Sequence, residues 1–417
     1  MHPILFRIPL PTWTLPLGVT FAAVFLVAAA LAAFGWRRKS RDLLVAGAVL
    51  AAFAALGGFM MQGERFTLGP VPIPSYGTML CVALVVGWHL TLRLAEREGL
   101  PRELVVSSYF GTALCALLGA RLLYVAANPH EFSGFWDALA LRRGGLSAYG
   151  GLIGGLLGSW YFLKNRGLEL WHWADLAAPG LASGVFFTRI GCYLFGCDFG
   201  RPLTSSAPNW LKRVGTFPRW AEGTVADASG SPAWLEHVTS RGLSYAADTA
   251  LPVHPTQLYE ALAGALLLAL TFVLRDRSRF RGQLFLSFTF GYGVLRFLIE
   301  TLRDDAERGA FGPALAVQWL VALGLLAIGV AFAAGPARLL AVTRTRRLAQ
   351  VGVCLPALIA WLALRPSHGA QATRVEPSIS LWIAVLSAIA AALLFRRLQR
   401  GSAQNTSPIP AVSPNVV

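Results

Sequence analysis

The residues most able to do chemistry lie in one stretch, 188–202, which reads TRIGCYLFGCDFGRP. It holds two arginines, two cysteines five residues apart and one carboxylate, namely Arg189, Arg201, Cys192, Cys197 and Asp198. Arg189 follows a run of apolar or small residues, 182–187, that could lie at membrane depth. An arginine there costs about 2.5–3.5 kcal/mol on insertion scales. It therefore requires a carboxylate partner or an anionic ligand.

A second charged group follows in 290–303, where Arg296 and Glu300 are four residues apart. On a helix this spacing puts both side chains on one face, which predicts an ion pair. Such a pair would neutralise two charges in the membrane, and a paired carboxylate can also hold an arginine in position for a phosphate. Arg121 lies near the end of another apolar run. For it, snorkelling to the interface and ligand binding remain equal alternatives.

The elements that must position these residues are apolar runs. The chain of 417 residues is 55% hydrophobic and only 14% charged, with a mean hydropathy of +0.56, whereas a soluble domain carries roughly a quarter charged residues. The apolar residues fall into blocks of about 18–22, the length that crosses a hydrocarbon core of roughly 30 Å. We therefore predict an all-α polytopic membrane protein with about eleven transmembrane helices. Their approximate bounds are 15–35, 43–62, 76–94, 103–126, 146–163, 173–194, 257–274, 282–301, 314–334, 348–364 and 379–395.

Clusters of basic residues separate the predicted spans. They fall on alternate loops, such as 37–41, 275–281 and 396–400, and positively charged loops face the cytoplasm. The N-terminus and the long polar segment 198–253 then face outward. These loops also account for the formal net charge of +15. Since no basic stripe with interleaved aromatic residues occurs on a polar segment, we do not expect nucleic-acid binding.

The same topology gathers four arginines in the outer half of the membrane or at its outer rim: Arg121, Arg189, Arg296 and Arg303. Arginines there run against the positive-inside bias, so something else must stabilise them. A phospholipid headgroup is the obvious anion at that depth, and bidentate guanidinium–phosphate contacts suit an anionic lipid. The residues alone thus predict an outward-opening membrane protein that binds a lipid phosphate.

Seven segments, taken in order, resemble the phosphatidylglycerol–prolipoprotein diacylglyceryl transferases of bacteria. They are LGPVPIPSYG (68–77), GARLLY (119–124), GGLSAYGGLIGG (144–155), ADLAAPG (174–180), TRIGCYLFGCDFGRP (188–202), HPTQLYE (254–260) and FGYGVLRFLIETLR (290–303). Each segment alone is weak evidence, whereas seven in order with sensible spacing are specific. The resemblance implies a seven-helix core with two extra helices at each end. The expected division is 1–64 for the first two helices, 65–335 for the core with its periplasmic insertion 198–253, 336–398 for the last two helices, and 399–417 for a disordered tail.

The resemblance also implies an activity. Such enzymes transfer the diacylglyceryl group of phosphatidylglycerol to the thiol of the lipobox cysteine in a prolipoprotein signal peptide, which is the first step of bacterial lipoprotein maturation. The products are a thioether-linked lipid and glycerol-1-phosphate. No metal or organic cofactor is implied. The implied location is the bacterial inner membrane, with the active site toward the periplasmic side and membrane lipids around it.

Motif positions carry the family's site residues onto this chain. Arg189 and Gly200 match the signature's arginine and terminal glycine, and Tyr76 matches the tyrosine of the entry turn. Tyr292, Arg296 and Glu300 match the tyrosine, arginine and carboxylate of the later motif. The expected catalytic residues are Arg189, Arg296, Tyr149, Glu300 and Asp198. The expected lipid- and phosphate-binding residues are Arg189, Arg296, Arg121, Tyr76, Tyr292, Gly200 and Arg303.

The chain departs from the family pattern at three positions. Tyr149 stands where the family usually has a histidine, Cys192 replaces an asparagine and Cys197 replaces a glutamate, with Asp198 directly after it. A phenol with an ordinary pKa near 10 is a poor base, so Asp198, Glu300 and His254 remain candidates to take the thiol proton. The two cysteines could form a disulfide on the oxidising side or act as small packing residues.

Two other functions compete with the transferase. The three departures motivate a non-catalytic paralogue that binds anionic lipid or a lipoprotein client. A transporter would require broken helices or a repeat of spans around a midplane site, and we find neither in the sequence.

Overall fold

The protein is mostly helical in the computed structural model. The structure describes residues 2–9, 11–38, 65–129, 145–164, 166–221, 230–305, 311–340, 343–366 and 373–404, with single positions in the intervening stretches. These residues form two compact units, one of residues 2–75 and one that begins at Tyr76. The predicted span 43–62 lies outside the described residues except for isolated positions, and so do residues 405–417.

The first unit combines one long helix with two short sheets. Helix α1, Leu17–Arg37, matches the predicted span 15–35. Strand β1 (Ile4–Ile8) pairs with β4 (Val71–Pro74), and β2 (Trp13–Pro16) pairs with β3 (Arg65–Leu68), both antiparallel. We did not predict these strands. Prolines before helix α3 restrict the backbone there to extended conformations, which suits a short ribbon.

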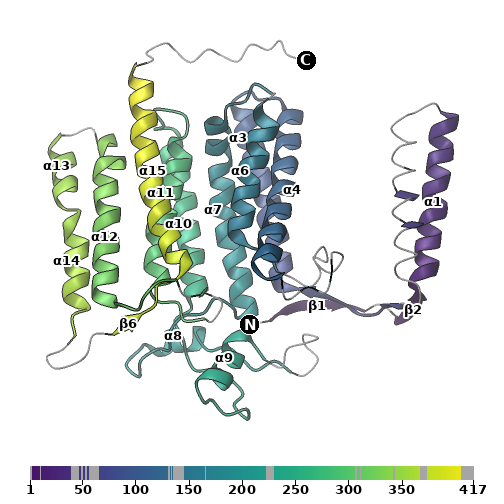
Figure 1. Cartoon of the computed structure of the whole chain (residues 1–417), viewed down its shortest axis with the longest axis horizontal. Helices are drawn as coiled ribbons and strands as arrows, with labels where there is room; N and C mark the ends of the chain where they lie inside the picture. The colour runs from purple at the N-terminus through teal and green to yellow at the C-terminus, as the bar shows by residue number, and fades with distance from the viewer. Residues whose placement is uncertain are drawn as a thin grey trace. The chain divides into compact units, whose positions relative to one another are not determined.

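The second unit is a bundle of helices at the positions of the predicted spans (Figure 1). They are α3 (Ser75–Arg97), α4 (Arg102–Ala127), α6 (Ala148–Lys164), α7 (Leu170–Phe195), α10 (Thr256–Arg275), α11 (Gln283–Glu300), α12 (Val317–Ala334), α13 (Thr343–Val351) with α14 (Cys354–Ala363), and α15 (Ile379–Gln404). Helix α15 thus extends into the segment 399–417 that we expected to be a disordered tail.

Six helical segments in the described part of the chain are long and apolar enough to cross a membrane. They are Ser75–Arg97, Arg102–Ala127, Thr256–Arg275, Val317–Leu339, Thr343–Ala363 and Ile379–Ser402. The all-α membrane class is therefore confirmed, whereas the count of eleven spans stays a prediction. Helices α7 and α11 are not among the six, and both carry charged residues that lower their hydropathy, such as Arg189 and Arg296.

Glycines allow α4 and α6 to pack with their backbones in contact. A Cβ atom on Gly119 would lie 2.4 Å from the carbonyl oxygen of Gly150, and one on Gly154 would lie 2.2 Å from that of Cys115. No side chain fits at such distances. The glycines of 150–158 thus give α6 a face that allows close helix packing.

Helices α7, α10 and α11 pack against one another and carry most of the charged residues of interest. Gly264 of α10 lies against the backbone of α7, where its Cβ would be 2.7 Å from the Phe186 nitrogen. Helix α15 packs along α11 in turn (Figure 1). The start of α12 is tied to the segment before α15 by the short pair β5 (Leu315–Ala316) and β6 (Arg374–Val375).

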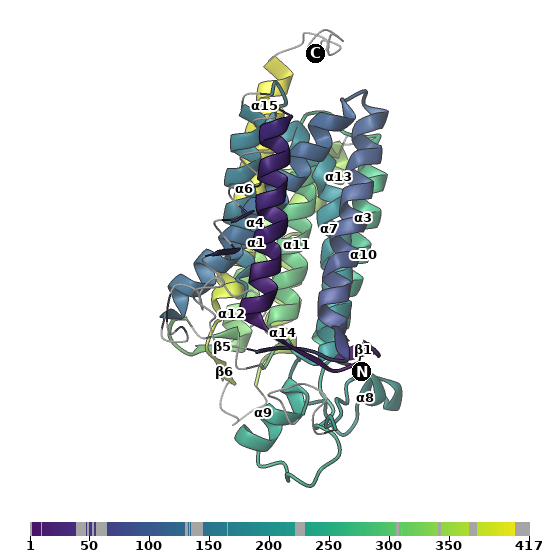
Figure 2. The same ribbon diagram turned by 90° about the vertical axis from the view of Figure 1, so that its right-hand side faces the viewer.

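The described residues of the predicted insertion, 198–221 and 230–253, form a small layer at one end of the bundle (Figure 2). It contains α8 (Asn209–Val214) and α9 (Pro232–Ser240), and Ser231 caps α9 by accepting a hydrogen bond from the Trp234 backbone N–H at 3.3 Å. Its own apolar core includes Phe217, Trp234 and Val253. A backbone bridge between Gly200 and Arg303 joins its first turn to the residues after α11.

Candidate active site

Arg189 occupies the last third of α7 and is paired on two sides. Its Nη1 lies 2.6 Å from Oδ2 of Asp198, and its Nε lies 2.8 Å from Oε2 of Glu260 on α10. The side chain is 19% exposed and that of Glu260 is 2% exposed. The cost of a buried guanidinium, which drew attention to Arg189 in the sequence, is thus met by two carboxylates.

Arg296 of α11 shares Glu260 with Arg189. Its Nη1 is in close contact with Oε1 of Glu260, and its Nη2 lies 2.8 Å from Oε2 of Glu300. The ion pair predicted from the spacing of Arg296 and Glu300 is therefore confirmed. Glu260 bridges two arginines from two helices and fixes the separation of their guanidinium groups.

Asp198 connects this pair to the loop that follows α11. Its Oδ1 accepts a hydrogen bond from Nη2 of Arg303 at 2.5 Å, while Oδ2 accepts from Arg189. Its backbone φ of 57° is left-handed, a conformation that aspartate tolerates better than most residues. Burial alone would raise the pKa of Asp198, but Arg189 and Arg303 outweigh it and hold that pKa well below its ordinary value. Asp198 is therefore ionised and is a weak base.

Two residues of the HPTQLYE segment hold the turn that contains Asp198. Thr256 donates from Oγ1 to the Asp198 carbonyl, and Gln257 donates from Nε2 to the Cys197 carbonyl, both at 2.5 Å. Gly200 sits where a Cβ would lie 2.8 Å from the Leu302 carbonyl oxygen and 2.8 Å from the Cβ of His254. Glycine is therefore required at this position by backbone contact.

The network as a whole is balanced in charge. Its cations are Arg189, Arg296, Arg303 and Arg308, and its anions are Asp198, Glu260, Glu300 and Asp305. The ion pairs of Arg189 use its Nη1 and Nε, and those of Arg296 use both of its terminal nitrogens. Among the described residues, Nη2 of Arg189 and Nε of Arg296 thus remain for a further acceptor. An arginine with spare donors on a fixed scaffold suits a phosphate oxygen.

Three predicted tyrosines surround the arginines. Tyr292 interacts electrostatically with both Arg189 and Arg296 and stacks on Phe288, with ring centroids 6.1 Å apart. Tyr76, 40% exposed, stands at the start of α3 within electrostatic range of Arg189. Tyr149 of α6 lies in range of Arg296 and donates its hydroxyl proton to Oγ of Ser380 on α15 at 2.8 Å. The structure thus brings all three to the charged network.

Arg121 lies apart from the ion pairs described above. It is 5% exposed on α4, donates from Nη1 to the Gly145 carbonyl at 2.9 Å, and stacks on Phe132 at 5.0 Å. These contacts place it at the interface between α4 and the segment before α6. Simple snorkelling of Arg121 to the membrane–water interface is excluded, because its side chain is buried in the protein.

Cys192 and Cys197 are free thiols, not a disulfide. With Asp198 they offer three metal-ligating atoms within 4.8 Å of one another. Both carboxylate oxygens of Asp198 are bound to arginines, and Nη1 of Arg189 also approaches the Cys192 sulfur at 3.9 Å. Nearby guanidinium charges repel a cation, so these residues do not fit a metal ion.

Several members of the network were missed in the sequence. They are Glu260, Asp305, Arg308, Ser378 and Ser380. Glu260 was within reach, since a carboxylate at the start of the predicted span 257–274 carries the same membrane cost as Arg189. The two serines offered no signal, because serine is common at helix starts and their partners are distant in sequence.

The fold and the network define a polytopic helical membrane protein with a buried arginine–carboxylate cluster near one end of its bundle. A family model described as prolipoprotein diacylglyceryl transferase matches residues 64–334, and the chain belongs to that family. Similar proteins include the phosphatidylglycerol–prolipoprotein diacylglyceryl transferases of three bacteria. That of Thermus thermophilus is 33% identical over 234 residues, 56% of this chain and 80% of the relative. Those of Bacillus cereus (31%, 64% of this chain, 88% of the relative) and Psychrobacter arcticus (32%, 58% and 81%) are comparable.

Proposed function

We propose that this protein transfers the diacylglyceryl group of phosphatidylglycerol to the lipobox cysteine thiol of prolipoproteins. The proposal agrees with the names of its relatives. The observation that carries it is the pair Arg189 and Arg296. Glu260 holds these two arginines on two helices, and each arginine keeps a nitrogen that can donate to a further acceptor. A phosphate leaving group gains charge in the transition state, and positioned arginines stabilise that charge.

In the proposed reaction the thiolate sulfur attacks the carbon of the diacylglyceryl group that bears the phosphate ester. A sulfur–carbon bond forms, the carbon–oxygen bond breaks, and the electron pair leaves on the phosphate oxygen of glycerol-1-phosphate. Arg189 and Arg296 face the phosphate in this scheme, because each keeps a donor nitrogen. Tyr76, Tyr292 and Gly200 shape the headgroup position, while Arg303 holds Asp198 and Arg121 supports the start of α6.

The proton of the thiol must go to a base, since the thiolate is the nucleophile. Asp198 and Glu300 are both committed to arginines. His254 lies beside Gly200, where burial and the charge of Arg201 lower its pKa, so that it is a neutral imidazole at pH 7. We therefore favour His254 as the base, with Tyr149 orienting the lipid.

The proposed location is the bacterial inner membrane, with this network toward the periplasm. Support comes from the positive-inside bias, which puts the arginine-rich loops at the opposite end of the helices. A lipobox signal peptide would then reach the network from the outer side. The small layer formed by residues 198–221 and 230–253 lies at this same end of the bundle and is available to contact it (Figure 2).

The test is turnover by the purified full-length protein. With phosphatidylglycerol vesicles and a lipobox peptide, we expect release of glycerol phosphate and a mass increase on the peptide. Arg296→Ala should abolish both, Arg296→Lys should reduce them, and Arg97→Ala on the exposed end of α3 should leave them unchanged. Melting temperatures separate loss of chemistry from loss of fold. Folded wild-type protein without turnover would contradict the proposal and favour a lipid-binding role.

A further inference from the structure

Helix α15 lies outside the part of the chain that matches the family model, yet it packs directly on α11. A Cβ on Gly293 of α11 would lie 2.7 Å from the carbonyl oxygen of Ala384 and 3.0 Å from the Cβ of Ala388. Phe297, which follows one turn later, is fully buried in the same cluster as Leu381. The two helices are therefore in backbone contact and share one core.

The start of α15 brings two serines to the charged network, Ser378 directly before the helix and Ser380 in its first turn. Ser378 donates from Oγ to Oε1 of Glu300 at 2.5 Å and accepts the Leu381 N–H at 3.1 Å, so it also caps its own helix. Both Ser378 and Glu300 are 0% exposed. Ser380 accepts the Tyr149 hydroxyl at 2.8 Å. One added helix thus contacts the Tyr149 phenol of α6 and the Glu300 carboxylate of α11, which is ion-paired with Arg296.

The Tyr149 contact is informative because of where each partner comes from. Tyr149 is the position at which the family resemblance led us to expect a histidine, and Ser380 lies beyond residue 334, where the family match ends. A phenol that donates its proton to serine turns the remaining lone pairs of its oxygen toward other donors. A headgroup hydroxyl of phosphatidylglycerol is a donor of the right kind.

We propose that α15 completes the active site, with Ser380 and Ser378 as positioning residues for Tyr149 and Glu300. The proposal rests on the function proposed above. Ser380 fixes the phenol so that its oxygen accepts a hydrogen bond from the lipid headgroup. Ser378 fixes Glu300 so that this carboxylate holds Arg296.

Kinetics of the full-length protein test the Ser380 contact. We expect Ser380→Ala to raise the KM for phosphatidylglycerol about fivefold, and Tyr149→Phe to do the same. The KM of the double variant should be no higher than that of either single variant. Such non-additivity is the signature of residues that act as a unit. Ser380→Thr should restore the wild-type KM. The matched control is Ser387→Ala on the same helix, because among the described residues the Ser387 hydroxyl bonds the Ala384 carbonyl of its own helix and no other group.

Two outcomes separate this inference from the proposed function. Suppose that the wild-type protein turns over. If Ser380→Ala then has an unchanged KM, or if the KM of the double variant rises by the product of the two single effects, the role of α15 is refuted and the function stands. If the folded wild-type protein does not turn over, both fail. A loss of melting temperature without Thr rescue would show a merely structural contact and would also refute the proposal.

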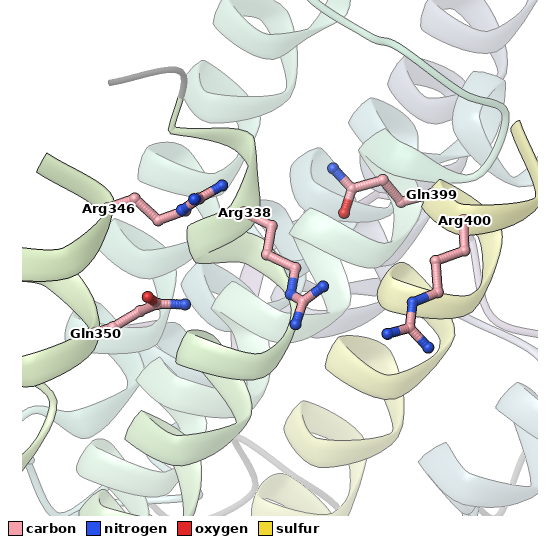
Figure 3. Close-up of a pocket in the computed structure, with 5 residues that line it drawn as sticks. All are labelled: Arg338, Arg346, Gln350, Gln399 and Arg400. Atoms are coloured by element: carbon pink, nitrogen blue, oxygen red, sulfur yellow. The ribbon is translucent and has the colours of Figure 1, made fainter. Parts of the chain in front are cut away.

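A second, independent observation concerns the opposite end of the bundle. A cavity of about 460 Å³ lies there between the end of α12, α13 and α15 (Figure 3). It is lined by Arg338, Arg346, Gln350, Gln399 and Arg400. Gln350 donates to the Ala333 carbonyl at 3.1 Å and so holds α13 on α12.

The three arginines of this cavity come from three segments, and its lining includes no carboxylate. Within the described residues none of the three forms an ion pair, and the Nε of Arg338 is buried without a hydrogen-bond acceptor. Converging guanidinium groups repel one another unless an anion lies between them. The cavity also lies where the apolar spans end, at the depth of lipid headgroups. We infer that it binds the phosphate group of an anionic phospholipid.

Native mass spectrometry of the full-length protein in detergent tests this site. With phosphatidic acid as the probe, we expect wild-type protein to retain one lipid more than Arg338→Gln/Arg400→Gln. The control Arg344→Gln/Arg397→Gln changes two exposed arginines of α13 and α15 that do not line the cavity, and it should match wild type. Phosphatidylcholine with the same acyl chains should not be retained. Equal retention by both double variants would overturn the inference, and displacement of the lipid by millimolar inorganic phosphate would show a free-phosphate site instead.

Discussion

Arg189 and Glu260 form a buried ion pair of 2.8 Å that joins α7 to α10. The other oxygen of Glu260 contacts Arg296, so a third helix, α11, is held at the same carboxylate. A carboxylate with 2% of its side chain exposed and two cationic partners sets the geometry of the two arginines proposed to bind phosphate. Glu260 is therefore the residue whose loss should disturb the network most.

Glu260→Gln should impair both chemistry and stability. The amide keeps the shape but removes the charge, which leaves Arg189 with one ion pair fewer and both guanidinium groups less well placed. We expect turnover to fall about 10²–10³-fold and the free energy of unfolding to fall by about 3 kcal/mol. Enzyme assay and thermal melting in detergent measure these effects. Glu103→Gln, at an exposed position in the first turn of α4, is the control; a fully active Glu260→Gln variant would remove Glu260 from the site.

Asp198→Asn tests the link between α7 and the loop after α11. Because the pKa of Asp198 is below its ordinary value of 3.8, its ionised form stabilises the folded state. That contribution is complete above pH 3.8 and is lost as the pH falls through the lower folded-state value. The wild-type protein should therefore exceed Asp198→Asn in melting temperature at pH 5–7, and the difference should shrink only in strong acid. A difference that vanishes at neutral pH would contradict the ion pairs.

Gly200→Ala should be disruptive although the change is one methyl group. The added Cβ would lie 2.8 Å from the Leu302 carbonyl oxygen, a backbone atom that cannot move aside cheaply. We expect a loss of about 1–3 kcal/mol in stability together with lower activity, measured by melting and turnover. Gly184→Ala in α7 is the matched control, because nothing lies within 4 Å of its Cβ. A Gly200→Ala variant with wild-type stability would show that the turn is looser than described.

The pH dependence of turnover tests His254 as the base. Burial and Arg201 lower the pKa of His254 from its ordinary value of 6.5, so the imidazole stays neutral across the neutral range. The rate should be flat near pH 7 and fall only when the pH drops below 6.5, as the ring becomes protonated. His254→Asn should lower kcat and abolish this acid limb. An unchanged acid limb in that variant would assign the proton to another group.

Much of the site could be predicted from the sequence because charges inside apolar runs are costly and therefore conspicuous. Arg189, Arg296 and Glu300 stood out for that reason. The i,i+4 spacing of Arg296 and Glu300 correctly predicted their ion pair. The same reasoning overlooked Glu260, which is ion-paired with both Arg189 and Arg296. It also left the role of Arg121 open, and burial against Phe132 then argued against snorkelling.

Local composition and motifs were sufficient to predict a helical membrane protein, the approximate positions of its described helices and the family it resembles. These properties follow from local composition, since about 20 apolar residues are required for each crossing. The pairing of charges between helices depended on the tertiary structure, because Glu260 lies far along the chain from Arg189 and Asp198 lies far from Arg303. The tertiary structure also decided that α15, beyond the family core, reaches Tyr149 and Glu300. Such contacts depend on how helices pack, and they cannot be predicted from the spacing of residues within one helix.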